Sequence, residues 1–217
     1  MKPKENHAGD TRVSSKMDQC QTPAYAIDPL LPHIKTYWTV WEPAYGEGHL
    51  ANALLTRSSG FDVFGTDLLS GTNFFDANPD GWDALITNPP YSVKYQWLER
   101  CFDIGKPFAL LVPLEMLGAE RAAKWFRIHH IEVIIMNPRI DFKMPNALWS
   151  KSSAQFPTCW LTWEFEIGRQ LTFARVNKPS KKELLVWDEK GPDYGAQKSQ
   201  TRTATKQQAL PLISETS

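Results

Sequence analysis

Four consecutive residues, Asn88-Pro89-Pro90-Tyr91, carry the most distinctive chemistry in the sequence. Two successive prolines remove two backbone donors and fix φ, so carbonyl oxygens project with no competing amide nearby. The Asn88 side-chain oxygen and the Pro89 carbonyl could each accept one hydrogen of an amino group, and the Tyr91 ring could stack on a planar ring. A rigid turn would have the same composition. The residue types favour an acceptor-lined pocket for an amino nitrogen.

A glycine-rich turn lies earlier in the sequence and consists of Glu42-Pro43-Ala44-Tyr45-Gly46-Glu47-Gly48. It stands where an apolar stretch ends and a helical pattern begins, and glycines there let the backbone pass close to a ligand. Asp67 follows the next apolar stretch, about 20 residues beyond the turn, where a carboxylate can accept both hydroxyls of a ribose. Since Glu42 and Glu47 would repel a pyrophosphate, the pattern favours a positively charged nucleoside cofactor over a dinucleotide.

The elements that position these residues follow from hydrophobic periodicity, because apolar stretches alternate with amphipathic ones between residues 37 and 165. Strands are predicted at 37–41, 61–64, 84–86, 108–112, 132–136 and 159–165. Helices are predicted after the glycine turn and at 92–102 and 119–128. In the last strand the alternation predicts one apolar and one polar face. This order is typical of an α/β protein with a mainly parallel sheet and helices on both sides.

The order and residue types of these segments resemble those of the DNA adenine-N6 methyltransferases. The small size of the chain is similar to that of family members carried by phages. The resemblance runs from about Thr22 to Phe165, and its most specific parts are the glycine turn and Asn88 to Tyr91. It implies a Rossmann-like class I methyltransferase fold, with a mainly parallel seven-stranded sheet and helices on both faces. It also implies S-adenosyl-L-methionine as the cofactor and DNA as the substrate.

The resemblance also assigns roles to individual residues. The catalytic group would be Asn88, Pro89, Pro90 and Tyr91. The cofactor site would consist of Thr22, Pro23, Glu42, Pro43, Ala44, Gly46, Gly48, Asp67, Leu68, Asp76 and Asn88. Within that set, Thr22 and Pro23 would lie against the methionine part of the cofactor. Asp67 would take the ribose, and Asp76 would take the adenine amine.

Both ends of the chain are polar, so residues 1–20 and 188–217 are expected to be flexible tails around a catalytic domain at 21–187. Enzymes with this motif order place a target-recognition region after the motifs, and little chain remains here for one. The loop at 138–153 mixes cations, aromatic rings and hydroxyls, so nucleic-acid contacts are predicted for Arg139, Lys143, Trp149 and Lys151. Alternatively, this loop is a surface connection in which Trp149 packs on the core.

The composition limits the other classes of function. The 24 basic and 24 acidic residues balance, so any nucleic-acid contact must come from a local patch. Cys20, Cys101 and Cys159 form no CxxC pair, and no third ligand accompanies His129-His130, so no metal site is predicted. The polar N-terminus and the lack of a membrane-length apolar run predict a soluble, cytoplasmic protein without a membrane partner.

Three other functions remain open from the sequence. The first is methylation of adenine or guanine nitrogen in RNA, because the pocket would read an unpaired base in either polymer. The second is methylation of protein glutamine, which is less favoured because the fuller glycine motif and helical N-terminal domain of those enzymes are missing. The third is a non-catalytic module with a methyltransferase-like fold. The oligomeric state is left open.

Overall fold

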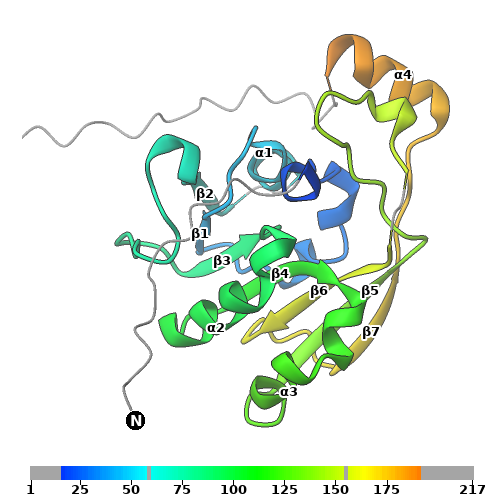
Figure 1. The fold of residues 1–217 in the computed structure, drawn as a ribbon. Helices are drawn as coiled ribbons and strands as arrows, with labels where there is room; N and C mark the ends of the chain where they lie inside the picture. Colours follow the sequence, from blue (N-terminus) through cyan, green and yellow to red (C-terminus); the bar gives the residue numbers. More distant parts are fainter. Residues whose placement is uncertain (1–15, 58–59, 154–155, 192–217) are drawn as a thin grey trace, which may run out of the picture.

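A single seven-stranded sheet organises the structure, a computed structural model that describes residues 16–57, 60–153 and 156–191 (Figure 1). The strand order is β2-β1-β3-β4-β6-β5-β7. The strands are β1 (Thr39–Glu42), β2 (Asp62–Gly65), β3 (Ala84–Thr87), β4 (Phe108–Pro113), β5 (Ile131–Asn137), β6 (Thr158–Trp163) and β7 (Leu171–Arg175). Only β6 runs antiparallel to its neighbours, which are β4 and β5.

Helices connect the strands. The α-helices are α1 (His49–Arg57), α2 (Lys94–Ile104), α3 (Glu120–Phe126) and α4 (Lys181–Lys190). Short 3₁₀ helices are η1 (Lys16–Gln19), η2 (Ala24–Ile27), η3 (Leu31–His33), η4 (Leu68–Ser70), η5 (Tyr91–Val93), η6 (Leu114–Gly118) and η7 (Trp149–Lys151). Among the residues that the structure describes, no helix has the length and apolar character needed to cross a bilayer.

The two faces of the sheet carry separate hydrophobic cores because side chains alternate along each strand. In the fully buried β4, Phe108 and Leu110 pack in one core with α2 and α3. Ala109 and Leu111 pack in the other core with α1 and η2. Figure 1 shows α2 and α3 on the opposite side of the sheet from α1. The expected Rossmann-like class I methyltransferase fold is therefore confirmed.

Strand β6 differs from its prediction, because both of its faces are buried. It lies between β4 and β5, where neither face meets solvent. Two of the four residues expected on the polar face hydrogen-bond internally: Trp160 Nε1 donates to the Ala26 carbonyl at 2.8 Å, and Thr162 Oγ1 donates to the Glu132 carbonyl at 3.1 Å. The other two, Glu164 and Glu166, lie beyond the end of β6 and are exposed. A strand whose polar groups find partners can be buried on both sides, so the prediction of a polar face was wrong for β6 itself.

The sequence patterns did not locate β7 or α4. Strand β7 is an edge strand with alternating exposure, and α4 begins with a capping box in which Ser180 and Glu183 satisfy each other's backbone amides. The boundary predicted after residue 187 falls inside α4, and η1 lies within the segment predicted as the N-terminal tail. The remainder of the two predicted tails, 1–15 and 192–217, lies outside the described residues.

Candidate functional site

The three predicted motifs meet at one edge of the sheet. Strand β1 pairs in parallel with both β2 and β3, so the carboxyl ends of the three strands are neighbours. The glycine turn follows β1, Asp67 follows β2, and Asn88 follows β3 directly. This edge is where open α/β sheets bind ligands.

Hydrogen bonds join the glycine turn to the end of β2. The Tyr45 amide donates to the Thr66 carbonyl at 3.0 Å, and the Gly46 amide donates to Asp67 Oδ2 at 2.8 Å. Gly46 and Gly48 have φ values of 51° and 78°, in the left-handed region that side chains disfavour. These contacts hold the turn beside Asp67.

The Tyr45 ring fills a cradle between two glycines, a feature that the sequence patterns did not predict. A Cβ atom added to Gly48 would lie 2.8 Å from the Tyr45 ring, and one added to Gly65 would lie 1.8 Å from it. The backbone of Gly65 is not in the left-handed region, so space alone demands glycine there. Tyr45 and Gly65 thus fix the shape of the turn together.

We expect Gly65→Ala to lower the free energy of unfolding by about 1–3 kcal/mol, because the added methyl overlaps the Tyr45 ring. Tyr45→Ala in the same chain should restore much of this loss, since it removes the overlapping ring. Urea unfolding of both single variants and the double variant measures the coupling between the two positions. Gly118→Ala is the control, because a Cβ there meets nothing within 4 Å. Purely additive effects would contradict this packing.

Glu42 is a buried acid at the same turn. It is 2% exposed, and the amide of Ala51 in the first turn of α1 donates to its carboxyl group. Its Oε2 atom has no hydrogen-bond partner among the described residues. Burial, with a further contribution from the nearby Asp67, raises the pKa of Glu42 well above its usual range. A cationic group bound beside the turn would satisfy this orphan oxygen.

We expect Glu42→Gln to reduce the pH dependence of stability. Because the folded state raises this pKa, the contribution of Glu42 is complete below its ordinary value of 4.5 and is lost as the pH rises through the folded value. Glutamine is neutral at every pH, so the variant should lose less stability over that range. Urea unfolding at a series of pH values checks this, with the exposed Glu47→Gln as the control. Parallel pH profiles for wild type and Glu42→Gln would argue against it.

The residues that follow β2 and η4 remain open to a ligand. Asp67 accepts from the Gly46 and Leu69 amides at 2.8 Å each, and its two oxygens have further lone pairs available. Leu68 is 55% exposed beside it. Asp76 is exposed and accepts from Asn73 Nδ2 at 2.6 Å. The carboxylates of Asp67 and Asp76 can therefore accept a hydrogen bond from a hydroxyl or an amine of a ligand.

The segment before η2 crosses the glycine turn. Gln21 exchanges two backbone hydrogen bonds with Lys143, at 2.8 and 3.1 Å, and its side chain lies 4.0 Å from where a Cβ of Gly46 would be. Thr22 is 4% exposed, and Pro23 is buried next to it. The structure thus brings the Thr22-Pro23 segment to the turn.

The Asn88 to Tyr91 segment presents two buried polar atoms that have no hydrogen-bond partner among the described residues. These atoms are Asn88 Oδ1 and the Tyr91 hydroxyl. The Tyr91 ring packs against Phe156, with ring centroids 5.5 Å apart, and edge-on against Phe142 at 6.3 Å. Burial raises the pKa of Tyr91 well above its usual range, so the hydroxyl stays protonated. Asn88 Oδ1 is one of several such atoms in the described residues, and its place just after β3, at the same sheet edge as the glycine turn, suits an incoming donor.

The backbone after this segment is held by an acid that the sequence patterns did not single out. The amide of Ser92 donates to Asp18 Oδ1 at 3.0 Å. Asp18 lies in η1, which contacts η5. The N-terminal segment therefore touches the Asn88 to Tyr91 loop as well as the glycine turn.

The residues predicted to contact nucleic acid separate into two groups. Arg139 and Lys151 are exposed on the loop between β5 and β6. Trp149 is 3% exposed and packs edge-on against Trp187 of α4, with the Lys143 ammonium 5.6 Å from its ring. Trp149 thus packs on the core, as the alternative interpretation expected, and its ring is not free to stack on a base.

Comparisons with known proteins found similar solved structures only at low identity. No protein-family model and no curated protein matches the sequence. The methyltransferase subunit of a type I restriction-modification system from Streptococcus thermophilus is 14% identical, over 83% of this chain and 53% of that one, with a TM-score of 0.48. The modification subunit of a putative type I restriction enzyme from Vibrio vulnificus is 12% identical, over 80% and 49%, with a TM-score of 0.47.

A putative RNA methyltransferase from Pyrococcus horikoshii is 15% identical, over 72% of this chain and 91% of that one, with a TM-score of 0.47. The chain thus spans about half the length of the two type I subunits and most of the length of the RNA methyltransferase. At these identities and TM-scores, the similarities carry no argument about activity.

Proposed function

We propose that this chain is an S-adenosyl-L-methionine-dependent methyltransferase that acts on the exocyclic N6 nitrogen of adenine in DNA. The observation that carries the proposal is the buried Oδ1 of Asn88, which has no hydrogen-bond partner among the described residues and lies just after β3, at the same sheet edge as the glycine turn and Asp67. An acceptor without a donor, at the edge where such sheets bind ligands, fits a donor that arrives with the substrate.

The cofactor fits the chemistry of the turn. Glu42 offers an orphan carboxyl oxygen to a cation, and Gly46 and Gly48 leave the backbone open for close approach. We assign the ribose to Asp67 and the adenine amine to Asp76. The remaining cofactor contacts are assigned to Thr22, Pro23, Pro43, Ala44, Leu68 and Asn88. When bound, the cofactor supplies an electrophilic methyl group on a sulfonium cation.

The chain's own residues prepare the nitrogen for attack. An adenine amine is a poor nucleophile because its lone pair is delocalised into the ring. Asn88 Oδ1 and the Pro89 carbonyl would each accept one N–H, which favours a tetrahedral nitrogen with a localised lone pair over the planar amine. Pro90 contributes no amide that could compete for these acceptors. Differential hydrogen bonding of this kind, together with positioning, accounts for catalysis without a covalent intermediate.

A base in a duplex cannot reach this site, so the adenine must be flipped out or already unpaired. Tyr91 would stack on the flipped ring, with Phe142 and Phe156 supporting it from behind. The exposed Arg139 and Lys151, with Lys143, are proposed to contact phosphates. Trp149 supports their loop from the core side.

Two experiments separate this function from its alternatives. Titration calorimetry with the cofactor distinguishes an enzyme from a non-catalytic module, and lack of binding at millimolar concentration would favour the module. Methyl transfer from labelled cofactor to DNA and RNA of the same sequence, with a glutamine-containing protein as a third substrate, distinguishes the polymers. We expect DNA to be labelled faster than RNA and the glutamine-containing protein to remain unlabelled.

A further inference from the structure

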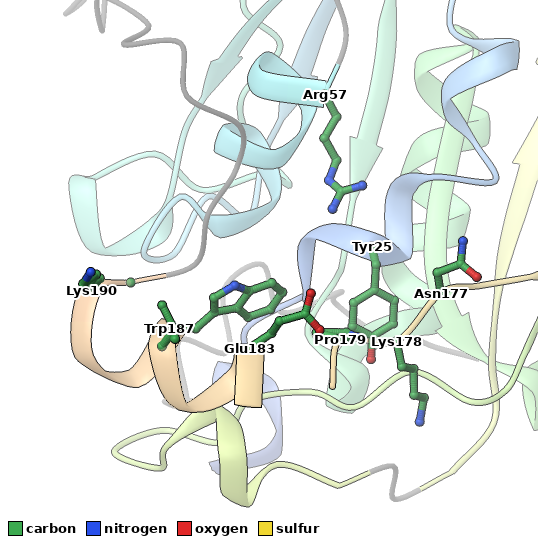
Figure 2. Close-up of a pocket in the computed structure, with 10 residues that line it drawn as sticks. Tyr25, Arg57, Asn177, Lys178, Pro179, Glu183, Trp187 and Lys190 are labelled. Carbon is green, nitrogen blue, oxygen red and sulfur yellow. The ribbon is translucent and has the colours of Figure 1, made fainter. Parts of the chain in front are cut away.

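A hollow of about 840 Å³ lies beside α4, and its lining includes none of the residues from Asn88 to Tyr91 (Figure 2). Its size falls within the range of ligand-binding sites. Its wall combines aromatic rings with cations and an amide, supplied by Tyr25 of η2, Arg57 of α1, Asn177, Lys178, and Trp187 and Lys190 of α4. In Figure 2, Arg57 and Trp187 extend toward the same space from opposite sides.

A second hollow lies next to the first. It has a volume of about 270 Å³ and shares the lining residues Trp187 and Gly191 with the first hollow. The second hollow is also lined by Glu47 of the glycine turn and by Lys143, whose backbone pairs with Gln21. We call the two hollows together the α4 groove. The lining of the groove therefore extends from Arg57 to Glu47 of the glycine turn.

The acids that line the α4 groove are already engaged by neighbouring donors. Glu183 accepts from the Ser180 amide and hydroxyl at 2.7 Å each. Asp188 accepts from the Ser150 amide at 3.1 Å and from the Ser150 hydroxyl, and the Trp149 amide also donates to it. Glu47 lies 3.2 Å from His49 Nε2. These contacts fix the positions of the carboxylates but do not remove their charge. Four cations line the groove against these three acids, namely Arg57, Lys143, Lys178 and Lys190.

The cations retain donors for a ligand. Arg57 pairs with Asp28, and Lys178 Nζ lies 3.0 Å from Asp141. A guanidinium has five N–H donors and an ammonium has three, so each keeps donors beyond its carboxylate partner. Lys190, at the end of α4, is exposed. The groove thus offers cations at intervals with an aromatic ring between them, the combination that binds single-stranded nucleic acid.

Trp187 is held in place by the contact between α4 and η7. Its ring lies edge-on to Trp149, with centroids 5.7 Å apart and planes at 87°. The adjacent Asp188 fixes the helix to the backbone of Trp149 and Ser150. A ring fixed in this way loses little side-chain entropy when a base stacks on it.

We propose that the α4 groove binds the single-stranded segment of nucleic acid that flanks the target base, with Trp187 stacking on a base and Lys190 contacting a phosphate. This inference rests on the proposed function and adds a binding surface to it. A strand fits better than a single nucleotide, because the lining cations are spread from Arg57 to Lys143 over two hollows that share Trp187 and Gly191.

The test is fluorescence anisotropy with a labelled single-stranded DNA oligonucleotide and with the RNA of the same sequence, over a series of salt concentrations. Trp187→Leu fills space without a π face and should weaken binding about 5- to 100-fold, whereas Trp187→Phe should have a small effect. Lys190→Ala should lower the slope of log K against log salt by about 0.7, the value for one phosphate of a single strand. Lys182→Ala is the matched control on the exposed surface of α4, outside the groove lining, and should leave the slope unchanged.

Melting temperatures and cofactor calorimetry of the same variants show whether the fold and the cofactor site are intact. Three results would contradict the proposal that the α4 groove binds nucleic acid. They are wild-type affinity in a folded Trp187→Leu variant, equal salt slopes for the two lysine variants, and no oligonucleotide binding by the wild type. If the wild type methylates nucleic acid and the groove variants do so equally well, the proposed role of the α4 groove is wrong, while the proposed methyltransferase function stands. If the groove variants weaken binding but the wild type transfers no methyl group, the groove stands and the proposed function fails. The better-bound polymer identifies the strand as DNA or RNA.

Discussion

Asn88→Ala should lower the rate of methyl transfer by about 100-fold or more while cofactor affinity stays nearly unchanged. The Asn88 oxygen is buried without a partner in the described structure, so its role is to accept a hydrogen of the substrate amine. Removal of one hydrogen-bond partner of a transition state typically has an effect of this size. Single-turnover rates with labelled cofactor, together with calorimetry, measure the two quantities separately.

The control for this prediction is Asn88→Asp, which keeps an acceptor oxygen at the same position. It should retain clearly more transfer activity than the alanine variant. Loss of cofactor binding in parallel with activity would show that Asn88 serves the cofactor site and not the amine. Equal rates for the alanine and aspartate variants would show that the acceptor is not needed.

Tyr91→Ala should have severe effects and Tyr91→Phe mild ones. The Tyr91 hydroxyl has no partner among the described residues, so its removal leaves no donor unsatisfied. The ring, in contrast, packs on Phe142 and Phe156, and truncating a buried aromatic residue costs about 3–5 kcal/mol of stability. Stacking on the flipped base would be lost with it.

A third variant, Tyr91→Leu, separates the effect on stability from the effect on the methyl-transfer rate. Leucine fills much of the space of the tyrosine ring but has no π face. Transfer is compared at a temperature where all variants are folded, as judged by circular dichroism. We expect the leucine variant to be folded and much slower than Tyr91→Phe. If the leucine and phenylalanine variants transfer methyl groups at the same rate, stacking by Tyr91 is wrong.

The site was predictable where its chemistry depends on local sequence. The glycine turn, Asp67 and Asn88 each follow a short apolar stretch, and parallel strands that neighbour one another place such residues at one edge. Strands β1 to β6 were predicted to within a few residues for the same reason, because periodicity is a local signal.

The features that escaped prediction depend on contacts between distant residues. Gly65 must be glycine because of the ring of Tyr45, and neither residue type reveals the other. Strand β6 is buried on both faces because its position between β4 and β5 places it between the two cores, with η2 over one face and α2 and α3 over the other. The burial of Trp149 depends on α4, nearly 40 residues later, whose start is marked in the sequence by the capping box of Ser180 and Glu183.

The most direct test of the proposed function is the identity of the methylated nucleoside. The purified protein is incubated with labelled S-adenosyl-L-methionine and with DNA or RNA of the same sequence, and the products are digested to nucleosides and separated. We expect label in N6-methyldeoxyadenosine from the DNA reaction with wild-type protein, and little or none with Asn88→Ala. Label on a different atom, or no label in any nucleoside despite cofactor binding, would contradict it.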